Sequence, residues 1–392
     1  MKRFGWILVL LTLAVPAWAA KTVTVQQLKD MLVSLQQDKK SDAEVAAELK
    51  QIELSEELTR ATMNSLVSYV PGPMSTEQIY VLEARSAVLA PPAADVPTTP
   101  APDAAAQKAL LDKAENYVNK TYAQLPRLTA TKMTLRFQDN LHAAASSSGM
   151  HSSAEDVSTG SSFVNANDYI RYINATQAQV ESANGAEQLS KAKDKTPWGA
   201  NAMIALQEQG PVLSTIFDEA QAAGKINWLR WESVNGKAAA VFSFEVDKKK
   251  SRYAVNYCCF PDVDQTGMLS YKSGSGPGSM TPSAHGNLQT STNWNNFKAT
   301  VPYRGEIFID PDTGIVVRLV VQAEFKPSEV VHQEDQRIDY GPVVVGGKTL
   351  VLPMKTIIDT EVVPNGDSGA AGRYSTRHTL FTEEYKDYQL AH

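Results

Sequence analysis

The stretch VPYRGEIFIDPDTGIVVRLVVQAEF, residues Val301–Phe325, predicts two β-strands joined by a tight turn. β-Branched and aromatic residues, which favour strands, lie on both sides of Asp310–Gly314. Asp310 and Pro311 are typical first residues of a turn, and Gly314 can adopt a positive φ without strain. Strands joined by so short a connection pair antiparallel. The stretch therefore predicts an antiparallel hairpin.

Further strands are predicted on both sides of this hairpin. Asn235-Gly236 joins two runs rich in apolar and aromatic residues, and Asn-Gly is the strongest short hairpin signal. Gly346-Gly347 joins two more, and a two-residue alternation begins at Leu128. The predicted strands cover residues 127–137, 168–182, 226–232, 237–247, 251–260, 301–309, 315–325, 332–347, 348–363 and 377–390. The short connections predict an antiparallel meander.

The front of the chain has helical periodicity instead. Helices are predicted at 22–35, 41–52, 55–70 and 75–89. Three begin with a capping box, formed by Thr24 with Gln27, Ser41 with Glu44, and Ser75 with Gln78. The third helix is expected to turn Leu58, Ala61 and Leu66 inward. Two later helices are predicted, one with Leu111, Ala114 and Val118 on one face and one at 196–224. The front end reads as a small helical domain, residues 20–90.

A change in composition separates the helices from the strands. Residues 91–105 contain five prolines among alanines, a composition that favours an extended linker. Residues 106–392 then form the sheet domain, with low-complexity insertions at 141–162 and 272–297. The predicted fold class is α+β: a small helical domain followed by a curved, unclosed antiparallel sheet with helices packed on it.

The first nineteen residues predict export. Lys2 and Arg3 precede a short apolar run, and Ala17-Trp18-Ala19 fits the small-x-small cleavage rule. The apolar run is too short to span a bilayer comfortably, and an uncleaved anchor is the alternative. We expect cleavage after Ala19 and a periplasmic or secreted protein with no transmembrane anchor.

Charge and cysteine content narrow the function classes. The chain has 37 basic and 43 acidic residues, and loss of Lys2 and Arg3 leaves a mature net charge of −8. This balance argues against nucleic-acid binding. The only cysteines, Cys258 and Cys259, are adjacent and cannot join distant segments. We expect packed or free thiols rather than a strained vicinal disulfide.

The sequence contains no recognised catalytic, metal or cofactor motif. Zinc-protease, nucleophile-elbow and phosphate-loop patterns are all absent. A Ser-x-x-Lys match at 190–193 lies in a polar loop and is short enough to arise by chance. His332 and Glu334 share a strand face without a third ligand, which favours a solvated strand over a metal site. We expect no catalytic residue, metal or cofactor.

Three turn and strand patterns follow one another along the chain. They are Ile309-Asp310-Pro311 with Thr313-Gly314, Val317-Arg318-Leu319, and Gly347-Lys348 with Leu350, Leu352 and Pro353. Their order resembles that of the periplasmic lipoprotein carriers, whose sheet curls around helices as an open barrel. The resemblance covers roughly residues 106–392, and its motifs are turn and strand patterns that speak for fold more than function. The carriers lack the helical front, the proline linker and the two insertions.

A half-closed sheet can bind a hydrophobic ligand if its concavity stays open. The candidate lining residues are aromatic, and the alternative is that they fill the core beneath the helices. Arg318 could face a ligand headgroup, although strand alternation favours solvent on the other face. The aromatic candidates are Trp228, Trp231, Phe242, Phe244, Tyr253, Tyr257 and Phe260.

Three functions follow, in order of preference. The first is an exported cell-envelope protein that binds a lipid, an acyl chain or a lipidated partner in the concavity of the sheet. The second is a protein-interaction module, in which the helical domain docks an envelope protein and the sheet is a scaffold. The third is an unrecognised hydrolase. An open apolar cavity would favour the first, and a filled sheet with an apolar patch on the helices would favour the second.

Overall fold

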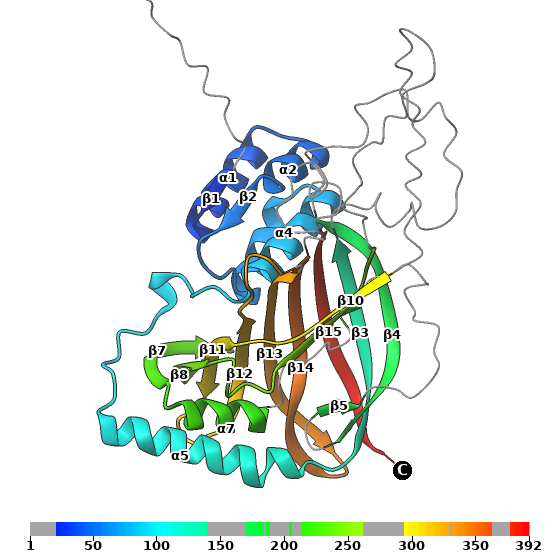
Figure 1. Ribbon diagram of the computed structural model, residues 1–392. Coiled ribbons are helices and arrows are strands. Elements are labelled where there is room, and N and C mark those ends of the chain that lie inside the picture. Colours follow the sequence, from blue (N-terminus) through cyan, green and yellow to red (C-terminus); the bar gives the residue numbers. More distant parts are fainter. Residues whose placement is uncertain are drawn as a thin grey trace, which may run out of the picture.

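The computed structural model describes residues 21–138, 170–183, 186–188, 204–205, 213–261, 294–329, 331–362 and 377–391. It confirms the predicted α+β class, because helices precede and flank a large antiparallel sheet that is not closed into a barrel (Figure 1). The predicted signal peptide and most of both insertions lie outside the described residues. The division into two domains and a linker stays a prediction.

Four helices and a small parallel strand pair form the helical front. The helices are α1 (Val25–Gln37), α2 (Asp42–Leu49), α3 (Arg60–Leu66) and α4 (Pro73–Arg85). The predicted capping boxes of α1 and α2 are both present. Strands β1 (Lys21–Val23) and β2 (Ile52–Leu54), which the sequence analysis missed, pair parallel beside them. The apolar faces meet in one cluster that includes Leu28, Leu49 and Met63.

Two local predictions for this region are wrong. Helix α3 begins after Thr59, so Met63 and Leu66 point inward while Ala61 is exposed. Helix α4 begins at Pro73, and Ser75 is a buried residue of its first turn. The carboxylate of Asp42 accepts hydrogen bonds from the main-chain N–H groups of Met74 and Ser75 at 3.0 and 2.8 Å. The N-terminal cap of α4 is thus supplied by another helix, which a local motif cannot reveal.

A ten-stranded antiparallel sheet forms the main body of the molecule. Its order is β5-β4-β3-β15-β14-β13-β12-β11-β8-β7. The strands are β3 (Leu128–Gln138), β4 (Arg171–Ala183), β5 (Ala186–Gln188), β7 (Ile226–Val234), β8 (Lys237–Val246), β11 (Tyr303–Ile309), β12 (Val316–Ala323), β13 (Val331–Val345), β14 (Lys348–Val362) and β15 (Arg377–Leu390).

The three hairpin turns predicted from the sequence are present in the structure. Asn235, Gly236, Gly346 and Gly347 all have positive φ, as their hairpin turns require. Gly314 also has a positive φ of 76°. The side chain of Asp310 accepts the N–H group of Asp312 at 2.9 Å, which closes the predicted turn.

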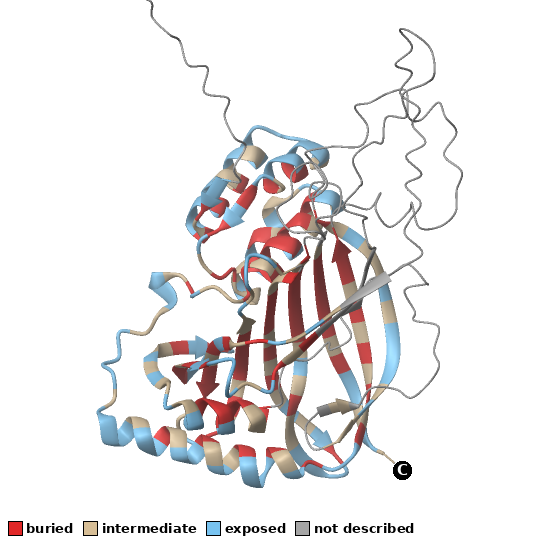
Figure 2. Ribbon diagram, in the orientation of Figure 1, coloured by how far each residue is buried: buried red, intermediate tan, exposed pale blue. Residues whose placement is uncertain are grey.

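Both faces of the sheet are covered. Helices α5 (Ala104–Lys120) and α7 (Leu213–Ala223) pack on one face, here called the inner face, over a large apolar core. Residues of α4 and the segment after it pack on the other, here called the outer face, where Val81 and Ala84 contact Ile357 and Leu380. Figure 2 shows the buried middle strands between these layers.

A smaller sheet joins the inner face. It has the order β10-β9-β6 and consists of β9 (Ala254–Pro261), β10 (Trp294–Thr300) and β6 (Ile204–Ala205). Val255 and Phe297 connect it to the core beneath α7. Ile204 and Ala205 were predicted to be helical. They instead pair with β9, because a partner strand distant in sequence overrides local helical preference.

Candidate functional site

The aromatic half of the inner face is a filled core. Phe242, Phe244 and Tyr253 are each at most 2% exposed, and they pack in the same cluster as Phe217 of α7. Phe244 and Tyr253 each meet the ring of the buried Tyr303 edge to face, with ring centroids 5.9 and 5.5 Å apart. In this half of the sheet the structure therefore matches the alternative that the sequence left open, in which these aromatic residues fill the core beneath the helices.

The other aromatic candidates lie at the rim of this core or have side chains that the structure does not describe. Trp228 and Trp231 are half-buried, and their ring centroids are 5.0 Å apart. The indole N–H of Trp231 donates to the carbonyl oxygen of Pro100 at 2.9 Å, so the proline-rich segment lies against it. Tyr257 and Phe260 lie on β9, but their side chains are outside the described part of the structure, as are those of both cysteines.

Arg318 lies on the outer face, away from the aromatic candidates. It is only 8% exposed, so the expectation that it points to solvent is wrong. The helical front covers this face, and a pattern of alternation cannot show that both faces are covered. The Arg318 guanidinium contacts Asp339 at 2.6 Å and Glu232 at 3.3 Å, and Glu57 of the helical front at 3.7 Å.

A network of buried ion pairs surrounds Arg318. The Arg337 guanidinium pairs with Glu57 and with Asp339, and it also donates to the carbonyl oxygen of Ala87. Burial alone would raise the pKa of Asp339, but Arg337 and Arg318 hold it at about 2. This network ties the helical front to the sheet, because Glu57 and Ala87 precede the proline-rich segment while both arginines lie on strands.

The second half of the inner face is polar and buried. Strand register places Glu334, Thr360, Thr379 and Gln138 directly opposite one another across β13, β14, β15 and β3. All four are at most 3% exposed. A parallel row begins at Ile338 and continues through Thr356, Glu383 and Thr134. Figure 2 shows the buried residues of these strands mainly in the half nearer to the helical front.

Several polar atoms in these rows have no hydrogen-bond partner. They include Glu334 Oε2, Thr356 Oγ1, Thr360 Oγ1 and Gln138 Nε2. Burial, together with the nearby Asp335 carboxyl, raises the pKa of Glu334 to about 8. The prediction that residues 332–335 form a solvated strand is therefore wrong. Unpaired buried polar atoms are costly, so water or a ligand would stabilise this face.

Four side chains form a closed polar ring at the next level of the inner face. Lys132 contacts Glu187 at 2.9 Å and Glu383 at 3.3 Å. The hydroxyl of Tyr385 lies 3.2 Å from Glu187 and 3.0 Å from Glu383. One hydroxyl has a single proton, so it donates to one carboxylate at a time. The arrangement fixes Glu187 and Tyr385 at the edge of a pocket.

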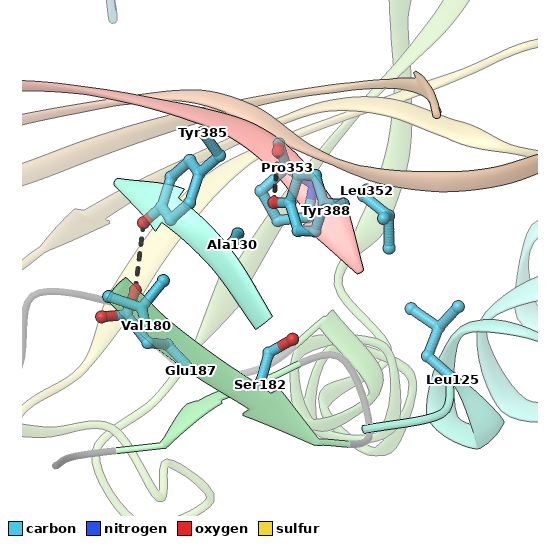
Figure 3. Close-up of a pocket in the computed structure, with 9 residues that line it drawn as sticks. All are labelled: Leu125, Ala130, Val180, Ser182, Glu187, Leu352, Pro353, Tyr385 and Tyr388. Carbon is cyan, nitrogen blue, oxygen red and sulfur yellow. Dashed lines mark hydrogen bonds between the residues drawn. The ribbon is translucent and has the colours of Figure 1, made fainter. Parts of the chain in front are cut away.

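That pocket lies at the end of the inner face, beyond the polar ring (Figure 3). Its cavity volume is about 30 Å³, so it admits only a small group, and its mouth is open to solvent. Leu125, Leu352 and Pro353 supply one side, and the hydroxyl of Tyr388 donates to the carbonyl oxygen of Pro353 at 2.7 Å. The remaining lining residues are Ala130, Val180, Ser182, Glu187 and Tyr385. The pocket thus combines an apolar wall with a polar one.

Nothing in the sequence indicated this pocket. Its residues come from four segments that lie far apart in the chain, and none belongs to a local motif. The alternation from Leu128 to Phe137 was visible in the sequence, but sequence alone does not show that Lys132 and Thr134 lie on a buried face.

A second hollow lies on the helical front. It has a volume of about 260 Å³ and lies between α1, α2 and the segment after α3. Its lining residues are Leu35, Gln36, Lys39, Lys40, Val45, Tyr69, Val70 and Pro71. Lys40 pairs with Glu44 at 2.9 Å, so this rim is partly neutralised.

Two features are absent from the described residues. No group of three or more His, Cys, Asp or Glu side chains is placed to hold a metal ion. None of the described helices is long and apolar enough to cross a membrane.

Comparison with known proteins does not identify a family. No protein-family model matches the chain, and no curated protein matches it. Among solved structures, a chain of the Pseudomonas aeruginosa MucA/MucB complex is similar over 72% of this chain and 94% of that chain, with 10% identity and a TM-score of 0.20. A TM-score this low supports no conclusion about fold or function. The resemblance to the lipoprotein carriers stays a prediction.

Proposed function

We propose that the chain is an exported, non-enzymatic binding protein of the cell envelope that holds an amphipathic ligand at the pocket end of the inner face. The main support for this proposal is the pocket, in which an apolar wall faces the fixed side chains of Glu187 and Tyr385. Ligand sites commonly combine apolar walls with a few placed polar groups. The predicted signal peptide supports the compartment.

The ligand in this proposal has a short or branched apolar part and a polar group. The apolar part would contact Leu125, Val180 and Leu352, and each buried methylene would stabilise the complex by about 0.8 kcal/mol. The polar group would lie towards Tyr385 and the row of unpartnered hydroxyl and carboxyl groups beyond it. A lipid or lipidated partner remains the leading chemical class, with its apolar end in the pocket.

Native mass spectrometry of the exported protein is the first test. A co-purified amphiphile should appear as added mass that organic extraction removes. The Val180→Trp variant should lose the adduct, because an indole would fill the pocket that Val180 lines. Gln179→Trp, which adds the same ring to an exposed neighbouring position, should retain it. Equal adducts in both variants, with both folded by circular dichroism, would place the ligand elsewhere.

The hollow on the helical front favours a second candidate, a protein-interaction module. Its apolar floor includes Leu35, Val45 and Tyr69, and two lysines lie at its rim. A photo-reactive residue at position 69 should then cross-link an envelope protein in cells, whereas the same residue at exposed Tyr80 should not. Cross-linking to one partner from both positions would show contact without use of the hollow.

A further inference from the structure

The two edges of the ten-stranded sheet differ in how they are protected. Edge strands expose unpaired main-chain groups, and proteins usually guard them with charges, prolines, bulges or covering segments. Strand β7 has such guards. Its register shifts at Leu229, it carries Arg230 and Glu232, and the segment around Pro100 hydrogen-bonds to Trp231.

Strand β4, at the other edge, lacks these guards over seven residues. It pairs with β3 along its length but with β5 only at Glu181–Ala183. The main chain of Asn174–Val180 therefore has a free side within the described part of the molecule. Its sequence, NATQAQV, has no charge, proline or glycine. Ala175 and residues 177–179 are exposed, and Figure 2 shows β4 as the palest strand of this side.

Structural stops mark both ends of this free edge. At one end, the register of β4 shifts at Ile173, and the Glu77 carboxylate accepts the N–H group of Tyr172 at 2.8 Å. At the other end, β5 begins to pair at Glu181. The free edge between them has room for one strand of about 23 Å, at roughly 3.3 Å per residue.

We propose that Asn174–Val180 binds an extended, uncharged peptide segment of another protein, which adds as an eleventh strand. Every second residue of the free edge directs its main-chain N–H and C=O groups outward, and such groups pair with any extended main chain. An uncharged segment fits because the seven side chains beside it carry no charge to neutralise an ionic one. This proposal is independent of the pocket.

A second copy of the chain does not fit the same edge. If two copies paired antiparallel through Asn174–Val180, residue 181 of one copy would lie opposite residue 173 of the other. Strand β5 occupies that side of Glu181. It would collide with residues 171–173 of the partner copy, so a separate strand is the occupant that the geometry allows.

Hydrogen exchange of the full mature protein tests the proposal. The probe is a peptide of seven alternating Thr and Val residues with one Lys at each end. Its control is the same peptide with every core residue N-methylated, which removes the donors. We expect the first peptide alone to slow exchange within Asn174–Val180 by about tenfold or more at its highest soluble concentration. The β7 edge serves as the internal control and should not change.

Three outcomes would overturn the proposal. The first is no slowing at β4. The second is equal slowing by the N-methylated peptide, which would mean that main-chain pairing is not involved. The third is slowing that depends on protein concentration without any peptide, which would make a second copy the occupant.

Discussion

Removing the charge of Glu57 should cost less stability than removing that of Arg337. The buried network contains three arginines, Arg230, Arg318 and Arg337, and four carboxylates, those of Glu57, Glu232, Asp339 and the half-buried Glu306. Glu57→Ala leaves three charges of each sign, and Arg337 keeps Asp339 as a partner at 3.1 Å. Arg337→Ala leaves two arginines facing four carboxylates.

The size of the two effects follows from this balance. Breaking a buried ion pair typically costs about 3–5 kcal/mol, because a buried charge loses its partner. We expect about 3 kcal/mol for Glu57→Ala, where the arginines retain partners, and about 5 kcal/mol for Arg337→Ala. The double variant should cost less than the sum, because the two residues interact directly.

Urea unfolding followed by circular dichroism measures all three free energies of unfolding. Loss of Glu57 also removes a negative neighbour of Glu232, whose pKa is raised mainly by burial and partly by Glu57. If Glu57→Ala proved as costly as Arg337→Ala, the reasoning from charge balance would be refuted. Additive effects in the double variant would show that the pair is not coupled as its geometry implies.

Three further predictions concern single side chains. Burial raises the pKa of Glu334 to about 8 from its ordinary 4.5. The protonated side chain therefore contributes its full stability below about pH 4.5, and this contribution is lost as the pH rises through 8. In urea titrations across that pH range, Glu334→Gln should reduce the fall in unfolding free energy, by at most about 5 kcal/mol. Phe242→Ala should lower the free energy of unfolding by about 3–5 kcal/mol, and Trp228→Ala by less because Trp228 is half-buried, and the reverse order would contradict the filled core. Gly314→Ala should lower the melting temperature more than Gly236→Ala does. Both glycines have positive φ, but the new Cβ at position 314 would lie 2.7 Å from the Cβ of Lys113, whereas nothing lies within 4 Å of a Cβ at position 236.

Local signals in the sequence predicted local structure well. The Asn235-Gly236 and Gly346-Gly347 turns, the cap of α1 by Thr24 and the open antiparallel sheet all appear in the structure. The turns and the cap depend on residues within a few positions of one another, so a short stretch of sequence is enough to determine them. The fold class followed from them.

Contacts between residues that lie far apart in the sequence were not predictable in the same way. Asp42 caps a helix that begins at Pro73, and Glu57 reaches two arginines that lie far along the chain. The alternation in β12 correctly put Arg318 opposite the apolar core, yet nothing local indicated that the helical front would cover it. The pocket was missed for the same reason, because its walls meet only in the folded sheet.

The position of β15 in the sheet has a consequence for how the chain reaches this fold. The strand formed by the last residues lies between β3 and β14, and Thr134 on β3 contacts Glu383 on β15 across 249 positions of sequence. Pairings of such long range close slowly, because the entropy of a large loop is lost before the contact forms. The centre of the sheet therefore cannot be completed until residues 377–390 have been synthesised. Truncation before Arg377 should therefore leave β3 and β14 without their shared neighbour, so that the sheet is divided into two parts.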